Sequence, residues 1–200
     1  MKKISLVLGM ALLVGFLMPN RAKADSGTST QTVNLAVSGN ALIRVDPGTN
    51  GSTDIALSLA GANSAGAEVN PVSTNAKTRL KISTLAGTGE TRKITAQNTS
   101  ATTLIGSRTQ LSIRLTEPNS NFTNRTEGGT LQTGTDGGYI IISNHTANSA
   151  AQDLVTGIGT CWSGIAADDG YVIDYKYMAT GGGTPTGKSG IVITFTIVAG

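Results

Sequence analysis

The chain has 200 residues, of which 26 are glycine, and a formal net charge of +3 at pH 7. Its single cysteine, Cys161, rules out a disulfide within one chain. Beyond residue 24 no basic cluster exceeds the pair Arg92-Lys93, so a nucleic-acid partner is not expected.

Residues 1–24 have the pattern of a secretory signal peptide. Lys2-Lys3 precede an uncharged apolar run from Ile4 to Met18, and Ala22-Lys23-Ala24 has the small residues of a cleavage site. The apolar run is shorter than the roughly 20 residues that a spanning helix needs. No later stretch is long and apolar enough either, so we expect no membrane span after cleavage. Four of the 15 basic residues lie in this segment, which leaves a formal charge of −1 on the mature chain. We expect a bacterial protein that is secreted or displayed on the outer cell surface.

After the signal, the sequence predicts a polar, flexible leader at 25–31 and a single domain at 32–200. Stretches in which apolar side chains recur at every second position predict strands throughout this domain. The predicted strands are 32–38, 41–45, 54–59, 79–84, 92–96, 110–115, 139–143, 152–157, 171–177 and 189–200. Residues 60–75 predict a long loop, and the glycine-rich 86–90 predicts the turn of a hairpin.

About ten short strands without helical periodicity are typical of an all-β protein. We predict an immunoglobulin-like Greek-key β-sandwich of short antiparallel strands. A closed barrel is the structural alternative. The strongest strand pattern is the last one, at 189–200. This strand either pairs within its own sheet or forms an exposed edge that pairs with another chain.

Residues suited to catalysis or metal binding are few. His145 is the only histidine and stands in a polar loop, without the partner motif of a serine or cysteine hydrolase. Cys161 has no other base available, and we expect a buried thiol, with an intermolecular disulfide as the alternative. Asp168-Asp169-Gly170, considered with Asp174 as a calcium site, fits a turn better than a calcium loop. We therefore expect no catalytic residue, no metal and no cofactor, and a protein that is not an enzyme.

Four aromatic residues cluster in the sequence, and two interpretations of them stay open. The residues are Trp162, Tyr171, Tyr175 and Tyr177. Exposed, they would form a platform on which sugar rings stack. The three tyrosines also share one face of the strand at 171–177, which favours core packing.

Two alternating stretches, one near each end of the mature chain, carry a family resemblance. The apolar residues are Val33, Leu35 and Val37 in the first, and Ile191, Ile193, Phe195 and Ile197 in the second. This arrangement resembles secreted bacterial β-sandwich subunits of the pilin type, such as chaperone–usher fimbrial and spore-coat U-like proteins. The resemblance implies assembly by strand exchange, in which the first set is donated to a groove beside the second set in a neighbouring subunit.

The function expected from the sequence is therefore structural or adhesive. We expect a filament subunit that acts by β-strand pairing with itself or with other surface subunits. A carbohydrate-binding module that uses Trp162 and the tyrosines is the alternative.

Overall fold

The structure, a computed structural model, describes residues 39–59, 72–100, 108–117, 127–144, 150–180 and 190–200, which all belong to one compact unit. The predicted signal, the leader, His145 and the predicted strand at 32–38 lie outside these residues. Within the described part, no helix is long and apolar enough to cross a membrane.

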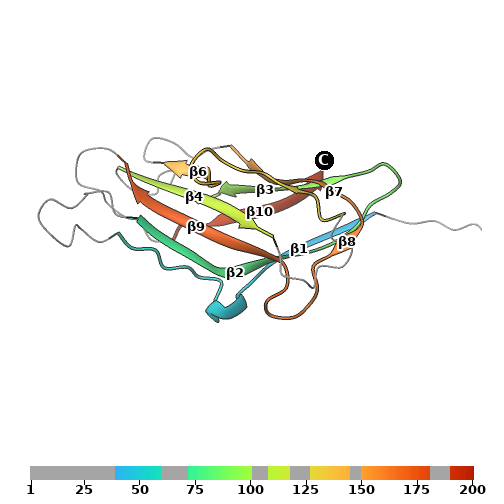
Figure 1. The fold of residues 1–200 in the computed structure, drawn as a ribbon, viewed down its shortest axis with the longest axis horizontal. Helices are drawn as coiled ribbons and strands as arrows, with labels where there is room; N and C mark the ends of the chain where they lie inside the picture. Colours follow the sequence, from blue (N-terminus) through green and yellow to red (C-terminus); the bar gives the residue numbers. More distant parts are fainter. Residues whose placement is uncertain (1–38, 60–71, 101–107, 118–126, 145–149, 181–189) are drawn as a thin grey trace, which may run out of the picture. The chain divides into compact units, whose positions relative to one another are not determined.

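The described residues form an all-β, sandwich-like arrangement of two antiparallel sheets (Figure 1). The strands are β1 (Asn40–Asp46), β2 (Val72–Leu85), β3 (Arg92–Asn98), β4 (Thr109–Thr116), β5 (Thr130–Leu131), β6 (Ile140–Asn144), β7 (Gln152–Ile158), β8 (Cys161–Trp162), β9 (Tyr171–Ala179) and β10 (Ile193–Ala199); a short 3-10 helix, η1, covers Gly48–Asn50. One sheet has the order β1-β2-β9-β4-β6, with β8 also paired to β2. The other has the order β10-β3-β7-β5.

The core lies between the two sheets and follows from the period-two alternation. In β9, Tyr171, Ile173, Tyr175 and Tyr177 point inward and are at most 9% exposed. They meet the inward residues of β2, β4, β3 and β7 in one continuous apolar cluster. The outward positions of β9 include Asp174 and Lys176, which hold polar contacts on the opposite face. Successive side chains of β9 thus alternate between the inner and the outer face of the sheet.

The predicted hairpin between 79–84 and 92–96 is wrong. The two strands form, but β2 belongs to the six-stranded sheet and β3 to the four-stranded sheet. The loop at 86–90 makes a turn, with Glu90 N donating to Gly87 O at 3.0 Å, and Ala86 N donates to Thr160 Oγ1 at 3.0 Å. Thr160 lies in the connection between β7 of the second sheet and β8 of the first, so this contact joins two places where the chain crosses from one sheet to the other.

Two further predictions need correction. The predicted strand at 54–59 is not a strand in the structure, although Ile55, Leu57 and Leu59 do pack against the core. The predicted loop at 60–75 runs too far, because β2 begins at Val72. The two-residue strands β5 and β8 were missed, since such short pairings leave no readable alternation.

Candidate functional site

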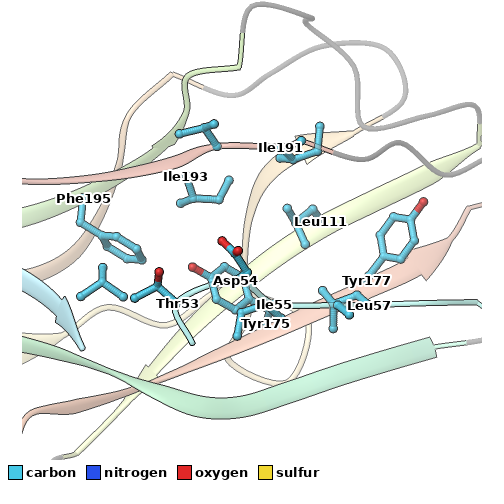
Figure 2. Close-up of a pocket in the computed structure, with 14 residues that line it drawn as sticks. Thr53, Asp54, Ile55, Leu57, Leu111, Tyr175, Tyr177, Ile191, Ile193 and Phe195 are labelled. Atoms are coloured by element: carbon cyan, nitrogen blue, oxygen red, sulfur yellow. The ribbon is translucent and has the colours of Figure 1, made fainter. Parts of the chain in front are cut away.

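An apolar groove lies between the last strand and the extended segment that follows η1 (Figure 2). Its volume is about 870 Å³. The lining residues are Val45, Thr53, Asp54, Ile55, Ala56, Leu57, Leu111, Tyr175, Tyr177, Gly190, Ile191, Val192, Ile193 and Phe195. Eleven of these 14 residues are aliphatic or aromatic, so the groove suits a mainly apolar occupant.

One wall is β10 with the three residues before it. Ile193 and Phe195 alternate inward, with exposed threonines between and after them. The start of this wall is tied to the end of β3: Thr99 N donates to Val192 O at 2.9 Å, and Val192 N donates to Ser100 Oγ at 2.7 Å. Among the described strands, β10 pairs with β3 alone. Within the described residues, the other edge of β10 is therefore unpaired, and its backbone groups can accept a further strand.

The opposite wall is the segment 53–57, in which apolar side chains alternate as in a strand and which pairs with none of the described strands. Ile55 and Leu57 turn toward the core, and the backbone of 55–59 makes no hydrogen bond to another described residue. Ile55, Leu57 and Leu59 are half-buried, whereas Ala56 and Ser58 are exposed, as in a strand with one face on the core. The backbone N–H and C=O groups of 55–59 are therefore available to an added strand, like those of a sheet edge.

The floor comes from the inner face of the larger sheet. Leu111 in β4 and Tyr175 and Tyr177 in β9 supply it. Burial raises the pKa of Tyr175 well above its ordinary value, so its phenol stays neutral. The Tyr177 hydroxyl is buried, yet it has no hydrogen-bond partner among the described residues. A polar atom of an occupant would satisfy it.

The structure brings together part of the predicted strand-exchange set. Ile191, Ile193 and Phe195 line the groove, and Ile197 packs on the core further along β10. The predicted donor residues Val33, Leu35 and Val37 lie outside the described residues. Sequence reasoning did not assign the opposite wall or the floor to this site. The alternation at 54–59 was the available signal for the wall.

The predicted aromatic platform is divided between two faces of the larger sheet. Trp162 is 48% exposed on the outer face, whereas Tyr171, Tyr175 and Tyr177 are buried on the inner face. The Tyr171 hydroxyl donates to Gly128 O. The four residues therefore do not form one surface.

The other two candidates considered in the sequence, the Cys161 thiol and the Asp168-Asp169 turn, are held by packing and hydrogen bonds within the fold. Cys161 is fully buried, and burial raises the pKa of its thiol. Asp169 accepts a hydrogen bond from Ala166 N at 2.7 Å, and the nearby Ile165 and Ala166 carbonyls accept from Lys81 Nζ. An ammonium group thus stands where a calcium ion would use those carbonyls. No group of three or more metal-ligating side chains occurs in the described ranges.

Comparison of the chain with protein-family models, with curated proteins and with solved structures finds no match. The likeness to pilin-type subunits therefore stays a prediction from the sequence.

Proposed function

We propose that the protein is a non-enzymatic, exported surface subunit that assembles by accepting a β-strand in this groove. The occupant is the segment Thr32–Ser38 of a neighbouring copy. An immunoglobulin-like Greek-key topology and display at the outer cell surface belong to the same proposal. Because donor and acceptor are different surfaces, such contacts continue from copy to copy and build a filament.

The observation that carries the proposal is that two facing stretches of backbone lack a partner among the described residues. Within the described residues, β10 has one open edge, and the strand-like segment 55–59 has no backbone partner. A strand laid between them would gain main-chain hydrogen bonds from both sides. An aliphatic small molecule would fill the volume but leave the backbone groups of both walls unpaired.

The donor segment has the side-chain pattern that the groove requires. Val33, Leu35 and Val37 recur at period two, so one face of an extended Thr32–Ser38 is wholly apolar. That face would contact Leu111 and Tyr177 on the floor.

Chain length favours a donor from another copy. Gly39 lies beside Leu85 O, at the end of the domain where Gly200 N donates to Thr91 O at 2.9 Å. The groove begins at Val45, the far end of β1. Even an extended chain advances only about 3.3–3.6 Å per residue. Folded back along β1 in its own subunit, the segment would bring only Val33 to the level of Val45, leaving Leu35 and Val37 beside β1.

A complementation experiment tests this proposal. In the mature chain, Leu35→Asp should remove the donor and Ile191→Glu should block the groove, so each variant alone should be monomeric by light scattering after size exclusion. Mixing the two should give a one-to-one dimer and nothing longer, because one functional donor and one functional groove remain.

Matched controls separate assembly from folding. Asn34→Asp adds the same charge on the opposite side of the donor, and Val198→Glu places a charge on an exposed position of β10 outside the groove lining. Both should still assemble into oligomers, with filaments visible by electron microscopy. A wild-type chain that stays monomeric at every concentration, or two variants that fail to complement, would overturn the proposal.

A further inference from the structure

A second surface, on the outer face of the larger sheet, holds three of the eight exposed large hydrophobic side chains in the described residues. They are Leu42 (61% exposed), Leu85 (38%) and Trp162 (48%). Exposed apolar groups that gather in one place mark an interaction site more often than scattered ones do. We call Leu42, Ser83, Leu85 and Trp162, together with Asn40, the Trp162 face.

Strand register places these residues on one side of the sheet. Leu42 in β1 is paired with Ser83 in β2, and Ser83 is paired in turn with Trp162 in β8. Directly paired residues point to the same side, so the three side chains form a row across three strands. Asn40 and Leu85, paired two positions away, form the next row on that side. β1 and β8 both pair with the C-terminal part of β2, and Figure 1 shows them near the same end of that strand.

The backbone below Trp162 is held firmly. Ser163 N donates to Ile82 O at 3.0 Å, and Ile82 N donates to Ser163 Oγ at 3.0 Å. Lys81 Nζ then binds the carbonyls of Ile165 and Ala166 at 3.1 and 2.6 Å. The indole is therefore presented on a preorganised support, which lowers the entropy cost of binding a ligand there.

We infer that the Trp162 face binds a neutral sugar. A pyranose ring has an apolar C–H face that packs on an indole ring and on leucine side chains, and a rim of hydroxyls that needs hydrogen bonds. Here the apolar groups alternate with polar ones, because Ser83 lies between Leu42 and Trp162 and Asn40 lies beside Leu85. Within the described residues, the side chains of Asn40, Ser83 and Trp162 make no hydrogen bond. Their donors and acceptors remain available to hydroxyl groups.

Local charge favours a neutral sugar over an acidic one. Three cations of β1 and β2 lie on this side, Arg44, Arg79 and Lys81. Arg44 and Lys81 contact the Asp46 carboxylate at 3.0 and 3.2 Å, and Arg79 contacts the Asp168 carboxylate at 3.6 Å. Each of the three therefore already has a carboxylate partner. The polar residues between the apolar ones also set this surface apart from the more apolar core of a typical homodimer interface.

The single tryptophan makes the test direct, because all indole fluorescence reports on this face. The mature chain is titrated with cellohexaose, chitohexaose, mannohexaose and maltohexaose, and with the matching monosaccharides. We expect at least one hexasaccharide to shift or quench the emission in a saturable way. By calorimetry, Trp162→Ala should weaken that binding at least tenfold, Trp162→Phe should weaken it less, and Ser83→Ala should weaken it several-fold.

Two controls make the result decisive. Val198→Ala, an exposed aliphatic change on the other sheet, should leave the affinity unchanged. Leu35→Asp, which removes the proposed strand donor, should also leave it unchanged, so that failure of one proposal does not decide the other. No spectral change with any of these sugars, binding that persists in Trp162→Ala, or an emission that changes only with protein concentration would overturn the inference. The last result would show a second copy covering the face.

Discussion

The Asp46 carboxylate lies 3.2 Å from Nζ of Lys81, a lysine that is only 6% exposed. This pair joins the end of β1 to the middle of β2, and the same ammonium group holds the loop between β8 and β9. Replacing Asp46 by Asn leaves a buried cation with carbonyl partners only. We expect a loss of about 2–3 kcal/mol in the free energy of unfolding, measured by urea denaturation at neutral pH.

The same residue predicts an acid dependence. A backbone hydrogen bond from Gly48, followed by the interactions with Lys81 and Arg44, lowers the pKa of Asp46 below its ordinary value of 3.8. Its contribution is present above that value and is lost as the pH falls through the lower folded-state pKa. Asp46→Asn should remove this part of the acid destabilisation. The control Asp153→Asn, in a more exposed pair with Lys93, should cost less than about 1 kcal/mol.

Tyr139 gives a prediction for alkaline pH. Its hydroxyl donates to Asp174 Oδ2 at 2.5 Å, and burial together with that carboxylate raises the pKa of Tyr139 to about 12. The stabilising contribution is present below the ordinary tyrosine pKa near 10 and is lost as the pH rises through about 12. Tyr139→Phe should lower the free energy of unfolding by about 1–2 kcal/mol at neutral pH. It should also make the decrease in the free energy of unfolding at alkaline pH smaller. Ultraviolet absorbance titration and urea denaturation measure the two effects, and an unshifted phenol would contradict the arrangement.

Cys161 should be inert in the folded protein. The side chain is fully buried, and burial raises the pKa of its thiol, so both access and the thiolate fraction are low. Labelling with a disulfide reagent should be slow in buffer and should accelerate in urea in step with unfolding. Rapid labelling of the native protein, or a disulfide-linked dimer under oxidising conditions, would show that the thiol is accessible.

Gly134 is expected to tolerate no side chain. A Cβ atom there would lie 1.8 Å from the carbonyl oxygen of Tyr139, and the contacted atom is backbone that cannot swing aside. Gly134→Ala should therefore destabilise the fold by about 1–3 kcal/mol in thermal unfolding. At Gly87, by contrast, the nearest atoms belong to the flexible Glu90 carboxylate, so Gly87→Ala should have a much smaller effect.

Strand existence could be predicted from the sequence, but strand pairing could not. Alternation in 171–177 and 110–115 is a local property of the chain, and both stretches are strands with the expected inward side chains. The turn at 86–90 is local too. Whether its flanking strands pair depends on partners far along the chain, here β9 and β7, and no short-range pattern encodes that choice.

The groove was predicted on one side only, for the same reason. Ile191, Ile193 and Phe195 are recognisable because their stretch alternates strongly. The floor residue Leu111 looks like any other core residue until the two sheets are placed face to face. At 54–59 the sequence predicts a strand that the structure does not have. The side chains alternate as in a strand, but the backbone of 55–59 has no hydrogen-bond partner among the described residues.

The 14-residue strand β2 takes part in three ladders at once, with β1 on one edge and with β9 and β8 on the other. Its alignment therefore cannot change against one neighbour alone. A shift by one position would turn Leu80 and Ile82 outward and drive the charges of Arg79 and Lys81 into the core. Such a shift would disrupt the pairing of β2 with β1, β8 and β9 at the same time. The register of β2 therefore fixes the register of all three neighbouring strands.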